Sequence, residues 1–422
     1  MGLIGLGTVG GQVAQRLLTR GDKLRRSAGS DLRLCRVLVR DPEKKRAVSV
    51  PRELVGTDPD LLLEDQDIDV VVELAGGEEP ARTFIERAIK NRKHVVTANK
   101  VVMALHGPEL LELAAEMNVD VYFEAAVGGG IPLISTFKVD LQANDIERVS
   151  AVINGTTNYV LCRMSQAGLT LADAVAEAQA AGYAEADPSE DVDGHDAVAK
   201  LAIMASIAFG ARVKPADVYR EGIQGIELVD FRYARELGYE IKLIAHASRH
   251  DVSLDVRVHP AMVPLSHQLA QVEGAMNAVY IEGDLVGPVL LVGQGAGGAP
   301  TASAVVGDLI EVARSVGRQV QTRTAFTFDD EVAVIPMSEV STRAYLRCRV
   351  ADRPGVLARI FTIFGEERVS ISSAIQKELF EGASAEFVVT THPAPDAALE
   401  RTRRRIAELD VVHQVSTFLR VL

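Results

Sequence analysis

The segment GLGTVG at residues 5–10 decides the fold of the first part of this chain. It has the spacing GxGxxG, in which glycines allow a tight turn and let backbone N–H groups at a helix N-terminus approach a pyrophosphate. Leu3 and Ile4 precede the segment as the end of a short strand, and Val13 and Leu17 follow it at helical spacing. This context favours a dinucleotide-binding turn over a purely structural one.

Beyond this turn, short apolar runs alternate with helical patterns, as a parallel sheet with crossover helices requires. The sequence predicts a helix over residues 80–91, where apolar residues recur at helical spacing. Predicted strands cover residues 32–39, 70–74, 94–97 and 119–123. The pattern indicates an α/β fold of the Rossmann type, with a doubly wound parallel sheet.

After residue 125 the pattern changes to two long helices, which begin after Thr170 and Asp193, followed by alternating strands. This α+β pattern predicts a domain for substrate binding and dimerisation. An amphipathic stripe later in the chain predicts a helix that returns to the first domain. The predicted parts are residues 1–125 for the dinucleotide-binding domain, completed by the helix 301–316, then 126–300 for the catalytic domain, 317–342 for a linker and 343–422 for a C-terminal domain.

The last eighty residues have a complete pattern of their own, in the order strand, helix, strand, strand, helix, strand. Tyr345, Arg347 and Arg349 alternate with apolar neighbours, which is the period of a half-buried strand. Pro354 and Gly355 then open a predicted helix. The βαββαβ order is the ferredoxin-like plan and indicates a small separate domain.

Composition excludes several classes of protein. A net charge of −13 disfavours binding to nucleic acid or to an anionic membrane, since both need a positive surface. The 3 cysteines form no CxxC pair, so neither a disulfide framework nor a zinc site is indicated, and a reducing cytoplasm is the simplest compartment. Residues 285–307 carry no charge, but their glycines and prolines predict a strand and a loop instead of a membrane helix.

Residues 197–211 form an apolar helical segment in which Lys200 is the sole charged side chain. Asp196 lies four residues earlier, so both side chains project from one face of the helix. An ammonium held beside a carboxylate in an apolar setting can bind a polar substrate and transfer a proton at neutral pH. An ordinary surface salt bridge has the same spacing, and the local sequence leaves both interpretations open.

Charged residues also follow two strands of the predicted parallel sheet, where such sheets place their ligands. Arg40 comes after the second strand with Asp41 beside it and Lys44 nearby; an arginine accommodates a ribose 2′-phosphate and an acid favours the free 2′-hydroxyl, so NADP is only slightly favoured over NAD. Lys100 follows another strand, and it is either a cofactor or substrate contact or a solvated loop lysine.

Glu124 ends a further strand and is followed by three consecutive glycines at residues 128–130. Glycines expose main-chain carbonyls, and a carboxylate with several carbonyls is what a hard cation needs. The same glycines are also explained by a loop that allows another segment to approach closely. The sequence alone therefore leaves open whether this loop is a cation site or a closely packed turn.

Three further segments resemble the homoserine dehydrogenase family: GYAEADPSEDVDGHDAVAK at residues 182–200, NGTTNY at 154–159 and QGAGGAPTASAVVGDL at 294–309. The resemblance implies reversible, NAD(P)H-dependent reduction of L-aspartate 4-semialdehyde to L-homoserine, on the route to threonine, methionine and isoleucine. Since no kinase-sized region precedes Gly5, the monofunctional form of the enzyme is expected.

The resemblance also implies roles for particular residues of this chain. Lys200 is expected to be the proton donor or acceptor, Glu185 and Asp196 to bind the amino-acid substrate, and Asp191 to support the same polar cluster. A structural sodium ion is implied at Glu124 with Val127, Gly129 and Ile131. The positions expected at the cofactor are Gly5, Gly7, Thr8, Val9, Gly10, Arg40, Gly76, Lys100, Gly182 and Gly297.

The C-terminal domain resembles an ACT domain in the segments DRPGVL at 352–357 and SISSAIQ at 370–376. That resemblance implies feedback control by an amino acid, with threonine the expected effector, bound around Asp352, Gly355, Val356 and Leu357. Paired ACT sheets and exposed sheet edges both favour association, so a homodimer or homotetramer is expected.

Two other functions fit parts of the pattern. One is an amino-acid-sensing regulatory protein that keeps the nucleotide fold without turnover, although Lys200, Asp196 and Glu185 argue against it. The other is a different ACT-tailed Rossmann dehydrogenase, such as a hydroxyacid enzyme. Absorbance at 340 nm with homoserine and NADP excludes the sensor, and competition with 2-hydroxy acids separates the two enzymes.

Overall fold

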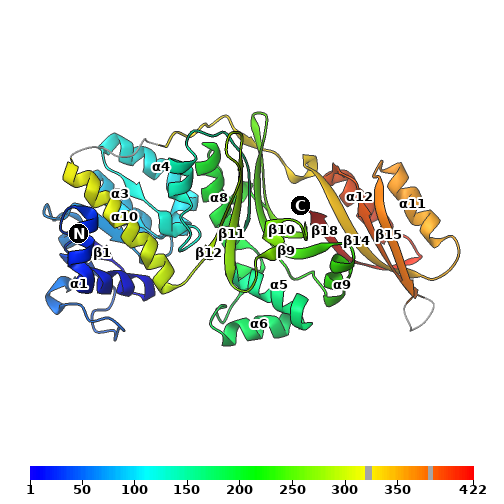
Figure 1. The fold of residues 1–422 in the computed structure, drawn as a ribbon, viewed down its shortest axis with the longest axis horizontal. Helices are drawn as coiled ribbons and strands as arrows, with labels where there is room; N and C mark the ends of the chain where they lie inside the picture. The colour runs from blue at the N-terminus through cyan, green and yellow to red at the C-terminus, as the bar shows by residue number, and fades with distance from the viewer. Residues whose placement is uncertain (319–325, 379–383) are drawn as a thin grey trace. The chain divides into compact units, whose positions relative to one another are not determined.

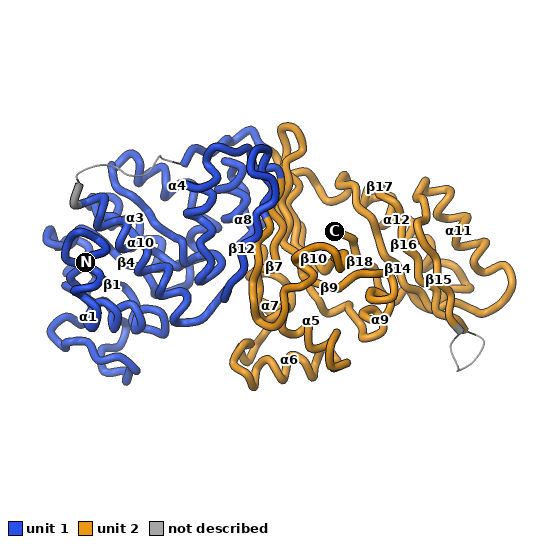
Figure 2. The backbone as a smooth tube through the Cα atoms, viewed as in Figure 1, with its two compact units in different colours: residues 1–147, 199–216, 281–332 blue, residues 148–198, 217–280, 333–422 orange. Residues whose placement is uncertain are grey.

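The structure is a computed structural model that describes residues 1–318, 326–378 and 384–422, so residues 319–325 of the predicted linker lie outside it. The chain divides into two compact units, coloured separately in Figure 2. The first comprises residues 1–147, 199–216 and 281–332, and the second comprises residues 148–198, 217–280 and 333–422. Among the described residues, no helix combines the length and the hydropathy that a membrane span requires.

The first unit contains a six-stranded parallel sheet in the order β3-β2-β1-β4-β5-β6. The order reverses at β1, as it does in a doubly wound nucleotide-binding fold, so the predicted fold class is confirmed. The strands are β1 (Gly2–Ile4), β2 (Arg36–Leu38), β3 (Val55–Gly56), β4 (Val70–Glu73), β5 (His94–Thr97) and β6 (Val121–Tyr122). The same unit holds β12 (Gly287–Gln294).

Helices α1 and α10 of this unit pack together, with a shared core against the sheet (Figure 1). Val13 and Leu17 of α1 share that core with Val305 and Leu309 of α10, so the apolar stripe predicted at residues 301–316 is buried along most of its length. Its last member, Val316, is 38% exposed. Helices α3 and α4 form a second packed pair. The bounds are α1 (Thr8–Ala28), α2 (Asp60–Leu63), α3 (Ala81–Lys90), α4 (Lys100–Met117) and α10 (Gly298–Arg318).

Strand β2 is shorter than the predicted strand at residues 32–39, since residues 32–35 lie outside the observed strand. Its partner β1 has only three residues, paired from Gly2↔Arg36 to Ile4↔Leu38. A parallel strand extends only as far as its neighbour supplies hydrogen bonds. Just before β2, the N–H of Cys35 donates a hydrogen bond to the carbonyl oxygen of Met1 (2.9 Å), which lies just before β1.

The second unit is organised around a mixed sheet that includes the order β7-β9-β10-β18-β14-β16-β15. The long hairpin β9–β10 forms its centre. The strands outside the C-terminal domain are β7 (Ile146–Val152), β8 (Tyr219–Arg220), β9 (Tyr239–His250), β10 (Ser253–Pro264), β11 (Met276–Gly283) and β13 (Ala333–Val334). The helices are α5 (Gly155–Ala167), α6 (Leu171–Ala180), α7 (Ser189–Val192), α8 (His195–Phe209), which continues into the first unit, and α9 (Leu228–Glu236).

The C-terminal domain has the predicted βαββαβ order, and its strand order β18-β14-β16-β15 is that of a ferredoxin-like sheet. Its apolar core lies between this sheet and helices α11 and α12. The bounds are β14 (Ser341–Ala351), α11 (Val356–Glu366), β15 (Ile371–Glu378), β16 (Ser384–Thr391), β17 (Ala394–Pro395), α12 (Asp396–Ala407) and β18 (Val412–Val421).

The expected half-buried pattern of strand β14 is wrong at two positions. Tyr345 is fully buried and Arg347 is only 3% exposed, although both belong to the polar set of the alternation. Both side chains hydrogen-bond the Asp230 carboxylate of α9, at 3.0 Å from Tyr345 Oη and 2.7 Å from Arg347 Nε. The part of this sheet face at Tyr345 and Arg347 is therefore covered by α9, whereas Arg349 is exposed as expected.

Strand β18 joins the C-terminal domain to the central hairpin, because its last residues pair in parallel with β10. Arg420, paired opposite Ala261, is 1% exposed and donates to Asp396 (2.7 Å) and Glu221 (2.8 Å). A buried guanidinium is tolerated only when it is paired and hydrogen-bonded. The two carboxylates satisfy that condition and hold the end of the chain in the sheet.

Two buried histidines of this sheet predict acid sensitivity. Burial, followed by the positive charge of Arg257, lowers the pKa of His246 and of His259 well below the usual range. The unfolded chain takes up these protons near pH 6.5 and the native state does not, so stability falls as pH drops through that value. We expect a loss of roughly 1.4 kcal/mol per pH unit for each histidine, measured by urea unfolding between pH 7 and 5.

The variant His259→Gln is expected to make the pH dependence shallower, because it removes one of the two titrating groups. His413→Gln is the matched control, since His413 lies on the exposed surface of β18. Equal slopes for His259→Gln and the unsubstituted protein would contradict the assignment.

Candidate active site

The glycine turn after β1 has the close contacts that a dinucleotide-binding turn needs. Gly5 has a φ of +93°, and a Cβ at Gly10 would lie 2.1 Å from the main-chain oxygen of Gly5. Any larger residue at either position would therefore distort the turn. Gly7 is the N-cap of α1, and a Cβ there would meet nothing within 4 Å, so open space lies beside the first turn of the helix. Backbone N–H groups in such a place bind phosphate.

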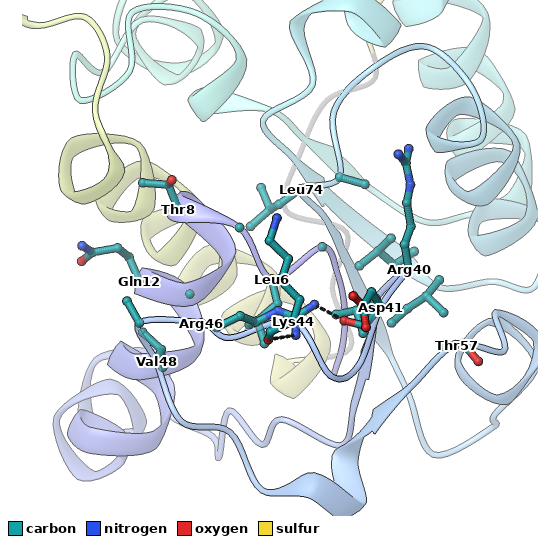
Figure 3. Close-up of a pocket in the computed structure, with 18 of the residues that line it drawn as sticks. Leu6, Thr8, Gln12, Arg40, Asp41, Lys44, Arg46, Val48, Thr57 and Leu74 are labelled. Carbon is teal, nitrogen blue, oxygen red and sulfur yellow. Dashed lines mark hydrogen bonds between the residues drawn. The ribbon is translucent and has the colours of Figure 1, made fainter. Parts of the chain in front are cut away.

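A cavity of about 820 Å³ lies beside this turn, a volume within the range of small-molecule and cofactor pockets (Figure 3). Thr8 and Gln12 of α1 lie on one side of it, and Arg40 and Asp41 on the other. Four residues expected at the cofactor line this cavity: Gly5, Gly7, Thr8 and Arg40. Val9, Gly10, Gly76, Lys100 and Gly297 belong to the same unit without being among its lining residues, and Gly182 belongs to the other unit.

The segment after β2 brings basic side chains to the cavity. Arg40, Lys44 and Lys45 line it, and within the described residues none of the three has a hydrogen bond or ion pair to another side chain. The main chain is held by Arg46, whose guanidinium donates to the carbonyls of Lys44 (2.8 Å) and Asp41 (2.6 Å). Three basic residues therefore line one pocket, which can hold an anion.

A buried carboxylate that the sequence did not single out supports the next loop. Glu73, at the end of β4, is fully buried and accepts hydrogen bonds from Thr97 Oγ1 (2.8 Å) and from Ala75 N (2.7 Å) and Gly76 N (3.4 Å). It fixes the turn at Gly76, whose φ is +74°. A single acid within an apolar strand is the signal that could have identified it.

Asn99 places Lys100 at the start of helix α4. Its side-chain oxygen accepts from Val102 N (3.2 Å) and caps the helix, and its amide donates to Gly77 O (2.7 Å). Lys100 is the first residue of α4 and is half-buried. Both the glycine loop after β4 and the lysine after β5 are thus held at the carboxyl end of the parallel sheet, where such folds bind ligands.

The second unit gathers acidic groups around Asn154, the N-cap of α5. Asn154 Nδ2 donates to Asp191 Oδ1 (2.6 Å) and to Asp196 Oδ2 (2.8 Å). Thr156 Oγ1 donates to Tyr183 O (2.7 Å) and ties the same helix end to the acidic segment. Glu185 is exposed, and among the described residues its carboxylate is not part of this network. The structure therefore joins two of the three expected acids through a residue that sequence reasoning missed.

Helix α8 carries both Asp196, in its first turn, and Lys200. Lys200 is 8% exposed and Asp196 is 5% exposed. An exposed surface ion pair does not fit this burial. An ammonium and a carboxylate on one nearly buried helix face are suited to binding and protonating a polar ligand.

The Glu124 carboxylate is held by the main chain. It accepts hydrogen bonds from the N–H groups of Ile134 and Ser135 (both 2.8 Å), and from that of Leu133. The loop after it is packed closely, because a Cβ at Gly129 would lie 2.6 Å from the Gly295 main chain. The Glu124 carboxylate therefore fixes the start of the segment 133–135 through three main-chain hydrogen bonds.

The two ACT-like motifs meet at one end of the C-terminal sheet. Gly355 has a φ of +88° and is the N-cap of α11, and Asp352 accepts a hydrogen bond from Gln376 (3.3 Å). Val356 is buried, whereas Asp352 and Gly355 are exposed. This end of the domain combines an open helix N-terminus with a side-chain amide and a carboxylate.

Comparison with known proteins gives one consistent answer along the chain. Residues 5–124 match the homoserine dehydrogenase NAD-binding domain, residues 132–310 match the homoserine dehydrogenase family, and residues 344–411 match the ACT domain. A homoserine dehydrogenase of Neisseria gonorrhoeae is 41% identical over 426 residues, which cover 100% of this chain and 98% of that protein.

Solved structures agree with the sequence matches. A homoserine dehydrogenase from Thiobacillus denitrificans is 42% identical with a TM-score of 0.93, covering 100% of this chain and 97% of that one. A hyperthermophilic archaeal homoserine dehydrogenase in complex with NADPH is 28% identical with a TM-score of 0.62, covering 74% of this chain and 96% of that one. With the glycine turn, the buried lysine and the acidic cluster in place, the chain belongs to the homoserine dehydrogenase family.

Proposed function

We propose that Lys200 is the proton donor and acceptor of this enzyme, an NAD(P)-dependent oxidoreductase that interconverts L-homoserine and L-aspartate 4-semialdehyde. The burial of Lys200 on the apolar helix α8 carries the proposal. When bound, the nicotinamide supplies or takes up the hydride. An ammonium near the carbonyl oxygen neutralises the charge that develops there as the proton is transferred.

The amino-acid part of the substrate is bound by the acids of the second unit. Asp191 and Asp196 are neighbours around Asn154, and a pair of carboxylates is the natural partner of an ammonium group. Glu185 follows Tyr183, whose carbonyl is tied to Thr156, and it completes the same set from the exposed side.

The cofactor is held at the glycine turn, where the close Gly5–Gly10 contact and the open helix N-terminus fit a pyrophosphate. Arg40, Lys44 and Lys45 favour NADP, because cationic groups that pair with no other side chain in the described part of the chain suit a ribose 2′-phosphate. The archaeal relative solved with NADPH supports this preference.

Removing the basic side chains is expected to reverse the cofactor preference. For the double variant Arg40→Ala and Lys44→Ala, we expect the KM for NADP to rise roughly 10²-fold or more, because charge-assisted hydrogen bonds contribute about 1.5–3 kcal/mol each. The KM for NAD should change little, since NAD lacks the phosphate. Homoserine oxidation is followed at 340 nm with each cofactor.

Lys23→Ala is the control for the loss of surface charge, because Lys23 is exposed on α1 outside the cavity. A parallel rise in KM for both cofactors would contradict a 2′-phosphate site. Absence of any 340 nm signal in the unsubstituted protein would contradict the proposed reaction itself.

A structural sodium ion is proposed at the main-chain oxygens of Val127, Gly129 and Ile131, next to Glu124. Because the Glu124 carboxylate already accepts three backbone N–H groups, its part is to hold the loop in shape. Carbonyl oxygens alone suit a weakly charged hard cation.

The ACT domain is proposed to bind an amino-acid effector, threonine, at the loop around Asp352, Gly355, Val356 and Leu357. An open helix N-terminus there suits a carboxylate group, and Asp352 suits an ammonium. A homodimer or homotetramer is proposed because β12 exposes Leu290 and Val292. A cytoplasmic location is proposed from the three free thiols.

A further inference from the structure

The amide group of Asn154 makes a full set of hydrogen bonds in the interior of the second unit. Asn154 is 4% exposed. Its oxygen accepts from the N–H of Thr157 (2.8 Å) and from the Thr157 hydroxyl (2.9 Å). Its nitrogen donates one hydrogen to Asp191 (2.6 Å) and the other to Asp196 (2.8 Å).

These bonds define which way the amide faces. A backbone N–H can only donate, so the oxygen of Asn154 must face Thr157, and the NH₂ group must face the acids. Both hydrogens are then used, one on each carboxylate. The two negatively charged carboxylates repel each other when they are close. A neutral amide that donates one hydrogen bond to each of them can lie between them and bridge them.

The two acids come from different elements, so something must hold them together. Asp191 belongs to α7 and Asp196 to the first turn of α8, and the turn between them contains Gly194 with a φ of +84°. Helix α7 is held by a hydrogen bond from the N–H of Ile223 to the carbonyl oxygen of Val192, its last residue (2.9 Å). Asn154 provides the corresponding link on the side of the acids.

We propose that Asn154 is a positioning residue for the reaction, which holds the Asp191 and Asp196 carboxylates in the fixed arrangement that receives the ammonium group of the amino-acid substrate. The inference rests on the proposed substrate role of these two acids. Asn154 acts on the substrate through them, as hydrogen-bond partners of a ligand-binding group commonly do. Its second role, as the N-cap of α5, is separable by mutation.

Asn154→Ser separates the two roles, because serine is also a good N-cap and lacks the two amide hydrogens. We expect the KM for homoserine to rise about tenfold or more, which corresponds to a lost charge-assisted hydrogen bond, while the KM for NADP stays within about twofold. The fall in kcat should be smaller, because the residue orders the substrate site and does not touch the reacting atoms.

Asn154→Asp preserves the size and the cap but places a third carboxylate between the other two. Such a cluster binds an extra proton at low pH and loses it as pH rises. We expect the ratio of the homoserine KM in this variant to that in the unsubstituted protein to increase with pH between 6 and 9, a difference that a purely structural cap would not produce.

Thr170→Ala is the matched control, since Thr170 caps α6 through the N–H of Asp173 (3.2 Å). It should lower the melting temperature and leave both KM values unchanged. Unchanged homoserine KM in Asn154→Ser, with a raised KM in Asp191→Asn and Asp196→Asn, overturns the positioning role alone. Unchanged KM in the two aspartate variants overturns the proposed substrate site, and the positioning role with it.

Discussion

Replacing Lys200 by methionine is expected to lower kcat by about 10²-fold or more, with the KM for NADP almost unchanged. The magnitude follows from the loss of a positioned general acid. Methionine has a similar length and no charge, so it suits a position that is 8% exposed on an apolar helix. Turnover is measured by homoserine oxidation at 340 nm, and binding by fluorescence titration of the reduced cofactor.

Lys200→Arg tests whether proton transfer or charge alone matters. An arginine retains the positive charge but does not release a proton in the accessible pH range. We expect its kcat to stay close to that of Lys200→Met. Recovery of most of the activity in Lys200→Arg would show that the charge alone is sufficient and would contradict the role in proton transfer.

Lys93→Met is the control for the removal of a buried lysine. Lys93 is 2% exposed, and its ammonium donates to the carbonyls of Asp65 and Ile68. Its loss should reduce stability and leave the kcat of the remaining folded enzyme unchanged. A comparable fall in kcat would mean that burying methionine in place of lysine damages the enzyme in general.

The parts of the molecule that local sequence could predict are those whose cause is local. The glycine spacing of GLGTVG implies the contact between Gly10 and Gly5, and the apolar run 94–97 has the bounds of β5. Lys200 is distinctive because it is the sole charged residue in the apolar segment 197–211, with Asp196 one helical turn before it. Each of these signals is contained within about fifteen residues.

What local sequence could not predict depends on partners far away along the chain. Asn154 lies 37 residues before Asp191 and 42 before Asp196, and as one polar residue before a helix it reads as an N-cap. Arg347 alternates with apolar residues and reads as solvent-facing, because its partner Asp230 lies 117 residues away. Burial of a charge is decided by its partner, which periodicity does not contain.

The largest stability effect is expected at Asp230, the carboxylate between α9 and strand β14. Asp230 is fully buried and accepts hydrogen bonds from Tyr345, Arg347 and Thr417, the last at 2.8 Å. It also accepts from the N–H of Glu227 (2.9 Å) as part of the capping box of α9. Burial and the Asp230 charge together raise the pKa of Tyr345, so the phenol stays a donor.

Asp230→Ala is expected to reduce the free energy of unfolding by about 3–5 kcal/mol, because it leaves the nearly buried Arg347 guanidinium without its main counter-ion. Glu227 and Glu386 still contact Arg347, at 2.9 and 3.2 Å. We therefore expect the loss in the free energy of unfolding to lie near the lower end of this range. Urea unfolding measures the change. Glu86→Ala, which removes an exposed ion pair with Lys90, is the control and should have little effect.

Variants of Asp230 also test how the C-terminal domain is coupled to helix α9 of the second unit. Asp230→Asn keeps the shape and retains one acceptor, so it should be milder than Asp230→Ala and leave a folded enzyme. Strand β14 carries the two donors to Asp230 and ends at the proposed effector loop at Asp352, so weakening this contact should also weaken inhibition by threonine. If Asp230→Asn unfolds like the unsubstituted protein and responds equally to threonine, Asp230 links neither stability nor control to this face of the ACT sheet.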